Sequence, residues 1–221
     1  TQKATYDFKK EYGFGDMPVN AVGDWGTLQA KAFTFNKKRN QLNLKGYNQI
    51  TTDKGILTAE KETRIYRNDN KSVSYGNATI QQAESSMRAD KIIAYFSDKG
   101  KKQIKKLEAY GKAVITMEDK TLLADKVEVL FTLNAKNEIK TAYAYGNVQV
   151  ITTKGTAHGK RGVYSPQAQK VDLYDDVVLE QNGNFIKGTH AQTDLSTSVS
   201  RITANEKNGG RISGIFYKRK K

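Results

Sequence analysis

Short segments of this chain alternate between apolar and polar residues with a period of two. The clearest segments follow four similar dipeptides, which we call the markers: Tyr75-Gly76, Tyr110-Gly111, Tyr145-Gly146 and Tyr174-Asp175. Aliphatic residues hold the second and fourth positions after each marker: Ala78 and Ile80, Ala113 and Ile115, Val148 and Val150, Val177 and Leu179. A period of two is typical of a β-strand that buries one face. Each marker is therefore predicted to lead into a strand.

The markers belong to a longer repeat, with successive intervals of 35, 35 and 29 residues. A degenerate copy begins at Gly46, where Asn48 holds the second position and Ile50 the fourth. Thirteen residues after each marker stands a small residue, which we call the small anchor: Ala59, Ala89, Ala124, Gly159 and Gly188. Repeats of this length stack like units, and their function usually lies along a continuous surface rather than in one pocket.

Each repeat is predicted to hold about three strands: one after the marker, one around the small anchor, and a short one before the next marker. Turn-forming clusters such as residues 68–70 and 134–137 separate them. Connections this short favour antiparallel pairing. We expect the marker glycine at a corner or bulge, and Asp175 in the same backbone conformation. The small anchors are expected where two backbones or sheets approach closely.

The domain organisation is predicted to be simple. We expect an irregular N-terminal arm over residues 1–23, one elongated repeat domain over residues 24–217, and a basic tail over residues 218–221. No run of eighteen apolar residues is present, so no transmembrane helix is predicted. The sequence begins at Thr1 without Met, so the lack of a visible signal peptide carries no information.

Composition and charge narrow the function. The net charge is +14, which indicates an acidic partner such as nucleic acid, anionic lipid or a phosphorylated glycan. Lysines on edge strands can also prevent unwanted sheet pairing. The chain has no cysteine, which excludes disulfides, thiolate catalysis and cysteine metal sites.

Candidate catalytic chemistry is sparse. His158 and His190 have no partners at metal-ligand spacing, so we predict that both lie on strand surfaces. Glu60, Asp90 and Asp125 follow small anchors and recur with the repeat, so we expect them to point outward and pair with lysines. No catalytic motif is found. We therefore predict no enzyme activity, no catalytic residues, no metal site and no cofactor. No aromatic RNA-stacking motif is present, so nucleic-acid binding is not expected.

The repeat itself resembles a known family. The segments Tyr75–Gln82, Met87–Tyr95 and Leu107–Ile115 resemble the OstA-like repeat of the lipopolysaccharide-transport proteins LptA and LptC and of the N-terminal domain of LptD. The pattern matches well at 76–110 and 111–145 and in degraded form at 146–174. The last copy has Thr189-His190 where Asp-Lys is usual. The resemblance covers about residues 40–217.

The resemblance implies an all-β fold, a twisted open β-jellyroll of two facing antiparallel sheets. Acyl chains would slide between the sheets, against an aliphatic lining: Ile50, Ile80, Ile115, Val148, Val150, Val177 and Leu179. Without the resemblance, the same residues would be read as a closed sandwich core. It further implies a non-enzymatic carrier of lipopolysaccharide in the periplasm, bridging the inner and outer membranes. Its partners would be LptC-like and LptD-like jellyroll domains and further copies of itself, joined head to tail through edge strands.

Alternatives remain open at this level. The segment 18–30 resembles the closing part of LptC, so the chain could be an LptA, an LptC-like membrane-anchored adaptor or a hybrid. From other classes, a basic β-rich nucleic-acid-binding protein and a purely structural repeat protein also fit the alternation and the charge.

Overall fold

The structure is a computed structural model, and it describes residues 3–98, 102–134, 136–197, 199–204 and 211–215. In these ranges the chain forms β-strands and turns, as its alternating pattern predicts. The described residues contain no helix that could span a membrane. Contacts divide the chain into two compact units, unit 1 (Thr1–Gly111) and unit 2 (Lys112–Lys221), each of which is described by itself.

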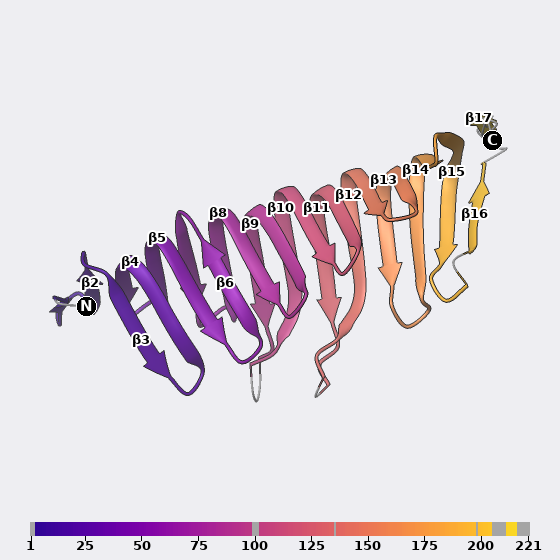
Figure 1. Ribbon diagram of the computed structural model, residues 1–221. Coiled ribbons are helices and arrows are strands. Elements are labelled where there is room, and N and C mark those ends of the chain that lie inside the picture. Colours follow the sequence, from indigo (N-terminus) through magenta and orange to yellow (C-terminus); the bar gives the residue numbers. More distant parts are fainter. Residues whose placement is uncertain (1–2, 99–101, 135, 198, 205–210, 216–221) are drawn as a thin grey trace. The chain divides into compact units, whose positions relative to one another are not determined.

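Unit 1 is an antiparallel meander of short and long strands (Figure 1). Its strands are β1 (Thr5–Asp7), β2 (Tyr12–Gly15), β3 (Val19–Gly23), β4 (Gly26–Asn36), β5 (Gln41–Thr52), β6 (Gly55–Ala59), β7 (Glu62–Tyr66), β8 (Lys71–Gln82) and β9 (Ser85–Phe96). Each of these strands pairs antiparallel with a neighbour close in sequence, as the short connections predict. The point of division between the units falls within β10 (Ile104–Met117).

Unit 2 continues the same antiparallel pattern. Its further strands are β11 (Lys120–Phe131), β12 (Ile139–Thr152), β13 (Gly155–Ser165), β14 (Lys170–Gln181), β15 (Asn184–Asp194), β16 (Val199–Thr203) and β17 (Ser213–Ile215). The last full strand, β15, pairs with β16 along one half and with β17 along the other. The all-β, antiparallel fold class is thus confirmed.

The marker dipeptides lie at β-bulges, as predicted. At the first, Gly76 and Asn77 both have positive φ, and the register with β9 shifts between Tyr75 and Ala78. The later markers repeat this pair of positive φ values at Gly111 and Lys112, Gly146 and Asn147, and Asp175 and Asp176. Glycine reaches this conformation without strain, and Asn and Asp tolerate it better than other residues. Asp175, with φ of 63°, therefore replaces the glycine as expected.

The predicted count of three strands per repeat is wrong, because the strand continues through the bulge. The short strand before a marker and the strand after it are two halves of one long strand, such as β8. The reason is that a bulge bends a strand and increases its twist while the pairing continues on either side. Each repeat from Gly76 onward therefore contributes two bent strands rather than three short ones, whereas in the repeat at Gly46 the second strand is divided into β6 and β7.

The two facing layers are these strand halves, joined at the bend, rather than separate sheets. In unit 1, Leu28 lies on β4 before its register shift and Leu44 lies on β5 before its bulge, so they occupy opposite halves. The two leucines nevertheless belong to one buried cluster with Ala30. Figure 1 shows the strands curling over at the bend. The inner faces of the two halves thus pack against each other beside the bend.

The expected N-terminal arm is more regular than predicted. Residues 5–7, 12–15 and 19–23 form β1, β2 and β3, and β2 and β3 pair with opposite halves of β4. The period-two pattern is weak here because the strands are only three to five residues long. The basic tail at 218–221 lies outside the described residues, and the single domain expected over 24–217 stays a prediction.

Candidate functional site

The predicted lining residues all lie on the half of a strand that follows the bulge, and they point to the same inner face. They differ in burial. Val148 and Val177, at the second position after the marker, are each only 1% exposed. At the fourth position the side chains are only partly buried: Ile50, Ile80, Ile115, Val150 and Leu179.

This gradient of burial describes the space between the strand halves. A closed sandwich would cover the fourth position as fully as the second, because both point to the same face. Here the cover decreases within two residues of the bend. The inner faces are therefore packed most tightly at the bend, and aliphatic side chains further from it stay partly accessible.

The opposite half of each strand closes the bend from the other side. Two residues before the marker Gly or Asp, and before Gly46, the side chains are buried: Leu44, Ser74, Ala109, Ala144 and Leu173. Together with the second position after the marker, these residues form the packed base of the fold, where no ligand could enter without displacing side chains.

The small anchors lie where backbones approach closely, as predicted. A methyl group at Gly188 would stand 2.8 Å from the carbonyl oxygen of Thr203, and one at Gly159 would stand 3.2 Å from the carbonyl oxygen of Tyr174. Ala59, Ala89 and Ala124 are buried at the same position in the other repeats.

The packing at the bend changes along the chain. Three residues after the anchor, Ile92 and Val127 are buried in the earlier repeats, and Gly162 and Ala191 hold this position in the later ones. A methyl group at Gly162 would lie 3.3 Å from Leu173 Cδ2 and 3.4 Å from Val148 Cγ1. The strand halves around Gly162 therefore come close enough to exclude a larger side chain.

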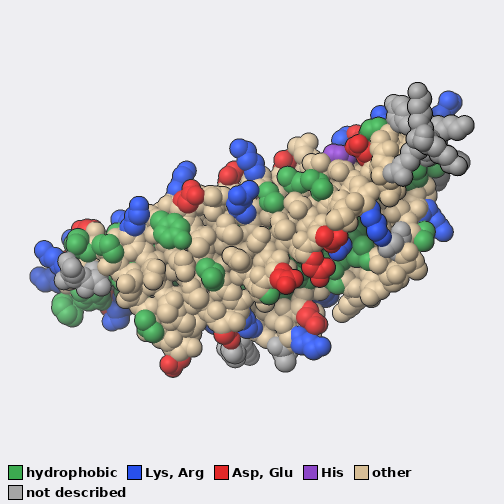
Figure 2. Space-filling model, in the orientation of Figure 1, with side chains coloured by type: hydrophobic (Ala, Val, Ile, Leu, Met, Phe, Trp, Pro, Cys, Tyr) green, Lys and Arg blue, Asp and Glu red, His purple; other side chains and the backbone are tan. Residues whose placement is uncertain are grey.

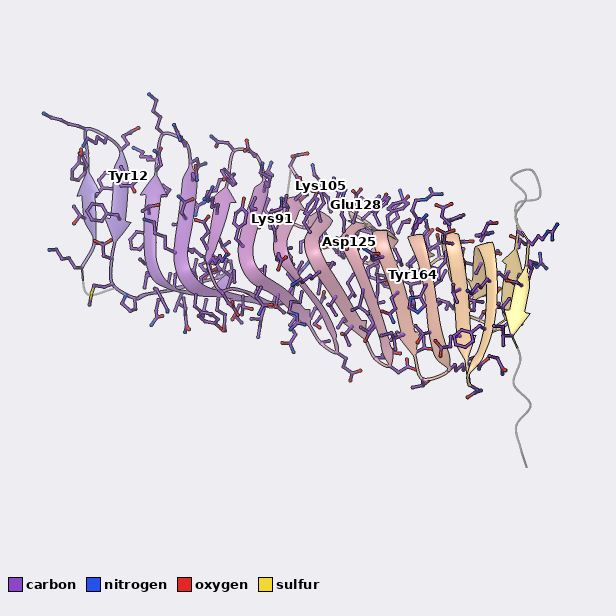
Figure 3. The ribbon with its side chains drawn as sticks, turned by 90° about the horizontal axis from the view of Figure 1, so that it is seen from above. Tyr12, Lys91, Lys105, Asp125, Glu128 and Tyr164 are labelled. Carbon is purple, nitrogen blue, oxygen red and sulfur yellow. The ribbon has the colours of Figure 1, made fainter. Side chains whose placement is uncertain are left out.

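The repeating carboxylates have a different role from the one expected. Asp125 accepts a hydrogen bond of 2.8 Å from Asn147, and Glu60 accepts one of 2.9 Å from Asn77. Asp90 lies over the bulge at Gly111, where its Oδ2 would be 2.5 Å from an added methyl group. The expected pairing with lysine is thus wrong for Glu60 and Asp125, because the bulge on the next strand brings an asparagine amide within reach. Figure 3 labels Asp125.

The marker tyrosines form cation–π pairs on the outer face. Lys91 lies 4.3 Å from the ring centroid of Tyr110, and Arg161 lies 5.3 Å from that of Tyr174. Lys126 lies 5.4 Å from the ring of Tyr145. Such pairs contribute about 0.5–1 kcal/mol each at exposed sites. The sequence shows that each of these cations stands two residues after a small anchor. This spacing does not identify the partner tyrosine, because the partner depends on the register between the strands.

His190 takes the place of the cation in the last repeat. Its ring stacks on Tyr174 at 4.7 Å and its Nε2 lies 2.8 Å from Asp172 Oδ1. Both histidines lie on strands and are partly exposed, His158 on β13 and His190 on β15, as predicted. The described residues form no cluster that could hold a metal ion.

A buried carboxylate supports the outer face of unit 1. Glu108 accepts hydrogen bonds of 3.1 Å from the hydroxyls of both Tyr95 and Tyr110, and pairs with Lys106 at 2.7 Å. Burial acts to raise the pKa of Glu108, but the hydrogen bonds from Lys106 and the two tyrosines outweigh it and hold the pKa below its ordinary value.

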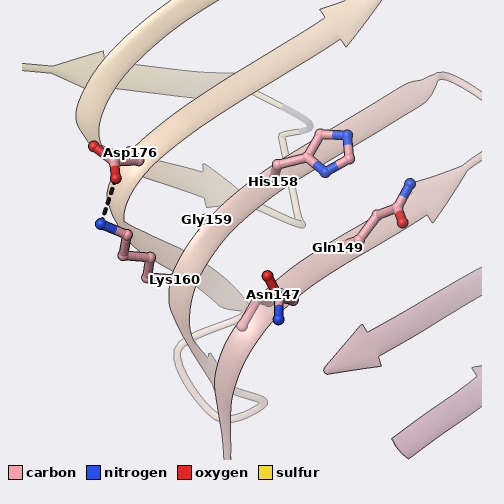
Figure 4. Close-up of a pocket in the computed structure, with 7 residues that line it drawn as sticks. Asn147, Gln149, His158, Gly159, Lys160 and Asp176 are labelled. Carbon is pink, nitrogen blue, oxygen red and sulfur yellow. Dashed lines mark ion pairs between the residues drawn. The ribbon is translucent and has the colours of Figure 1, made fainter. Parts of the chain in front are cut away.

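One cavity, of about 290 Å³, lies in unit 2 beside the bulges (Figure 4). Its lining is mostly polar: Asn147, Val148, Gln149, His158, Gly159, Lys160 and Asp176. Lys160 and Asp176 form an ion pair of 2.5 Å across it. Val148 is the single predicted lining residue that borders this cavity. The cavity is therefore distinct from the aliphatic inner face.

On the face seen in Figure 2, hydrophobic side chains form small, separate patches. These observations define a class of protein: an antiparallel β-repeat protein, bent once per strand, whose aliphatic side chains face each other across the bend.

Comparison with known proteins identifies the family. The model of the LptA/(LptD N-terminal domain) LPS transport protein family matches residues 57–120 and 112–199, which together span well over half of the chain. The chain belongs to this family, and the OstA-like resemblance of its repeats is confirmed.

Two further comparisons add little. No curated protein matches the chain. A solved structure that is similar is LptH, the LptA-homologous periplasmic component of the lipopolysaccharide transport device of Pseudomonas aeruginosa. It is 12% identical, with 73% of this chain and 94% of that chain covered, and a TM-score of 0.32. A similarity this low supports no argument about function, so the assignment rests on the family match.

Proposed function

We propose that this chain is a non-enzymatic periplasmic carrier of lipopolysaccharide. The acyl chains would lie between the strand halves, against the predicted lining residues of each repeat. The observation that carries the proposal is the burial gradient, because it leaves the fourth-position aliphatics accessible on every repeat. The family of the chain supports the class of cargo.

The physical argument is that a carrier needs many similar weak sites. Apolar surface removed from water stabilises binding by about 25 cal/mol per Å², without a requirement for directional contacts. Ile80, Ile115, Val150 and Leu179 hold the same position on successive repeats, so an acyl chain would meet similar surfaces on each. One deep pocket would instead retain the cargo.

The ends of the strand array are the candidate partner sites. At the N-terminal end, β3 pairs with β4, and at the C-terminal end β16 and β17 pair with β15. Edge strands expose unpaired backbone groups that can add to a neighbouring sheet. We therefore propose that LptC-like and LptD-like jellyroll domains, or further copies of this chain, pair with these ends and form a bridge between the two membranes.

The test is photo-crosslinking at matched inner and outer positions of one strand. A photoreactive amino acid replaces Ile80 on the inner face of β8 or its neighbour Thr79 on the outer face, and the same pair is built in β12 with Val150 and Gln149. Each variant is exposed to purified lipopolysaccharide. We expect lipid adducts at Ile80 and Val150 and few at the outer positions.

Equal labelling of inner and outer positions, in variants with unchanged circular dichroism, would overturn the carrier proposal. Binding of DNA or RNA in place of lipid, falling steeply with salt, would favour a basic nucleic-acid-binding protein instead.

A further inference from the structure

The hairpin turns of unit 1 form two lips on either side of the inner face. The strand β5 begins after the turn at 37–40, bends at its bulge and ends before the turn at 53–54, so these turns lie at opposite ends of the bent strand. By the same alternation, turns 8–11, 37–40 and 67–70 share one lip, which we call the basic lip. Turns 24–25, 53–54 and 83–84 form the opposite lip.

The basic lip is a hydrogen-bonded structure. The Lys37 amide donates to the carbonyl oxygen of Glu11 at 2.9 Å, and the Arg67 amide donates to that of Asn40 at 3.1 Å. The Asn40 side-chain amide also donates to Asn68 Oδ1 at 3.0 Å. The three turns are therefore held in fixed order, with successive turns two strand spacings, about 9.5 Å, apart.

This lip concentrates positive charge. Its turns carry six cations and two carboxylates: Lys9, Lys10, Lys37, Lys38, Arg39 and Arg67, with Glu11 and Asp69. Lys10 pairs with Asp7 and Lys37 pairs with Glu11. No carboxylate of the described residues forms an ion pair with Lys38, Arg39 or Arg67, and all three are exposed.

Neither the opposite lip nor the equivalent turns of unit 2 share this charge. The opposite lip carries Asp24, Asp53 and Glu84 with Lys54 as its one cation. In unit 2 the turn at 132–138 carries Lys136 and Glu138, which pair with each other, and the turn at 166–169 has no charged residue. An anionic group at the mouth of unit 1 would therefore be attracted to one side and repelled from the other.

We propose that the basic lip of unit 1 binds the phosphate groups of the glycolipid whose acyl chains lie between the strand halves. This inference rests on the proposed carrier function. Arg39 and Arg67 can each present two parallel N–H donors to a phosphate, while Lys38 supplies a point charge. Because the opposite lip is acidic, the cargo enters unit 1 in one orientation, with its phosphates toward turns 37–40 and 67–70.

The test compares two ligands with identical acyl chains, a bisphosphorylated acylated disaccharide and its dephosphorylated form. The full chain is compared with a lip variant (Lys38→Gln, Arg39→Gln, Arg67→Gln) and with a charge-matched control (Arg88→Gln, Lys112→Gln, Lys187→Gln). The control removes three exposed cations that lie away from both lips. Circular dichroism confirms the fold of both variants.

We expect the wild-type chain and the control to bind the phosphorylated lipid about tenfold more tightly than the dephosphorylated one, as three exposed ion pairs would give. The lip variant should lose this preference while its affinity for the dephosphorylated lipid stays unchanged. An undiminished preference in the lip variant overturns the lip proposal and leaves the carrier function standing. Failure of the wild-type chain to bind either lipid overturns the carrier function and the lip proposal with it.

A competition arm separates a lipid headgroup from free phosphate. Inorganic phosphate and the bisphosphorylated disaccharide without acyl chains are added to the wild-type complex at matched ionic strength. We expect weak competition, because neither ligand engages the inner face. Full displacement of the phosphorylated lipid by inorganic phosphate would show a general anion site and overturn the assignment to the cargo.

Discussion

The two units contain the same kind of bent strand, but different side chains pack at the base of the bend. In unit 1 the base of the bend is filled by large and polar side chains, with Leu44 and Ile92 beside a fully buried hydroxyl pair, Thr63 and Ser74, at 3.0 Å. In unit 2 the later repeats use Gly162 and Ala191 instead, and the halves approach closely. The comparison shows that the bulge is common to both units, while the side chains that pack at the base of the bend differ in volume.

The largest expected effect tests the filled base of unit 1. Ile92→Ala, which copies Ala191 of unit 2, should lower the free energy of unfolding by about 2–5 kcal/mol, because the space left in a packed core is only partly refilled. The neighbouring Ile93→Ala, on the outer and partly buried face of β9, is the control and should cost clearly less. Urea denaturation measures both. Equal costs would show that Ile92 does not separate the strand halves.

The second prediction tests the bulge as the common element. Gly146 has φ of 70°, and a methyl group there would overlap the Asp125 carboxylate. Gly146→Ala should cost about 2–4 kcal/mol, from backbone strain and the displaced carboxylate together.

Gly183 provides the matched control for Gly146. It has a similar φ of 78° in the turn between β14 and β15, but nothing lies within 4 Å of an added methyl group. Gly183→Ala should therefore cost about 1–2 kcal/mol, the backbone term alone. Thermal unfolding of both variants checks the difference, and identical losses would show that Asp125 has no part in holding the bulge.

The third prediction concerns the buried carboxylate Glu108 of unit 1, which contacts Lys106 and two tyrosines. Its pKa in the folded protein is lowered, so the stability that it provides is complete above its ordinary pKa of 4.5 and is lost as the pH falls through the lowered value. Glu108→Gln should cost about 1–3 kcal/mol at neutral pH, because Lys106 loses its charged partner. The difference from wild type should shrink below pH 4.5.

The control for this charge pair is Glu138→Gln, because Glu138 and Lys136 form an exposed ion pair of 3.8 Å. Such a pair contributes little, so stability should hardly change. A Glu108→Gln penalty that persists undiminished in acid would exclude the carboxylate charge as its source.

The smallest expected change in stability is for the replacement of a buried polar side chain, Asn48, by an apolar one. Asn48 is fully buried, and its Oδ1 has no hydrogen-bond partner, whereas Val148 and Val177 hold the same position in unit 2. Asn48→Val loses the bonds of 2.9 Å and 3.4 Å to the carbonyl oxygens of Gly46 and Ala59 but also removes the unpartnered acceptor. The two terms oppose each other, so stability should change by less than about 1 kcal/mol.

The reverse exchange sharpens this result. Val148→Asn would bury an amide in an apolar site of unit 2 and should cost about 1–3 kcal/mol. Chemical denaturation of both variants measures the asymmetry. A large loss for Asn48→Val would mean that its amide holds the degenerate bulge at Gly46.

Much of the fold could be predicted from the sequence because it depends on local rules. Alternation after the markers gave the strands, and the spacing of Gly and Asp gave the bulges, including the one at Asp175. The pairing of Asp125 with Asn147 could not be predicted, since it depends on a register between residues 22 positions apart. For the same reason the tyrosine–cation pairs and the Glu108 cluster were missed.

The lining of the candidate site was predicted as one set of seven residues, whereas the structure separates it into two levels. Val148 belongs to the packed base, and Val150, two residues further, is only partly buried. A period of two assigns both residues to the same face, but it contains no information on distance from the bend. That distance depends on how the two halves of the strand meet.

The hydrogen bonds between turns at the basic lip also affect how such a chain can change its length. The carbonyl oxygen of the last residue of each turn accepts a hydrogen bond from an amide at or just after the end of a later strand: Glu11 from Lys37, Asn40 from Arg67 and Asn70 from Phe96. Because every link is of the same kind, a pair of bent strands could be duplicated or deleted in evolution, and the neighbouring turns would still find a partner for each backbone group. Shorter and longer relatives can thus arise from whole repeats without redesign of the lip.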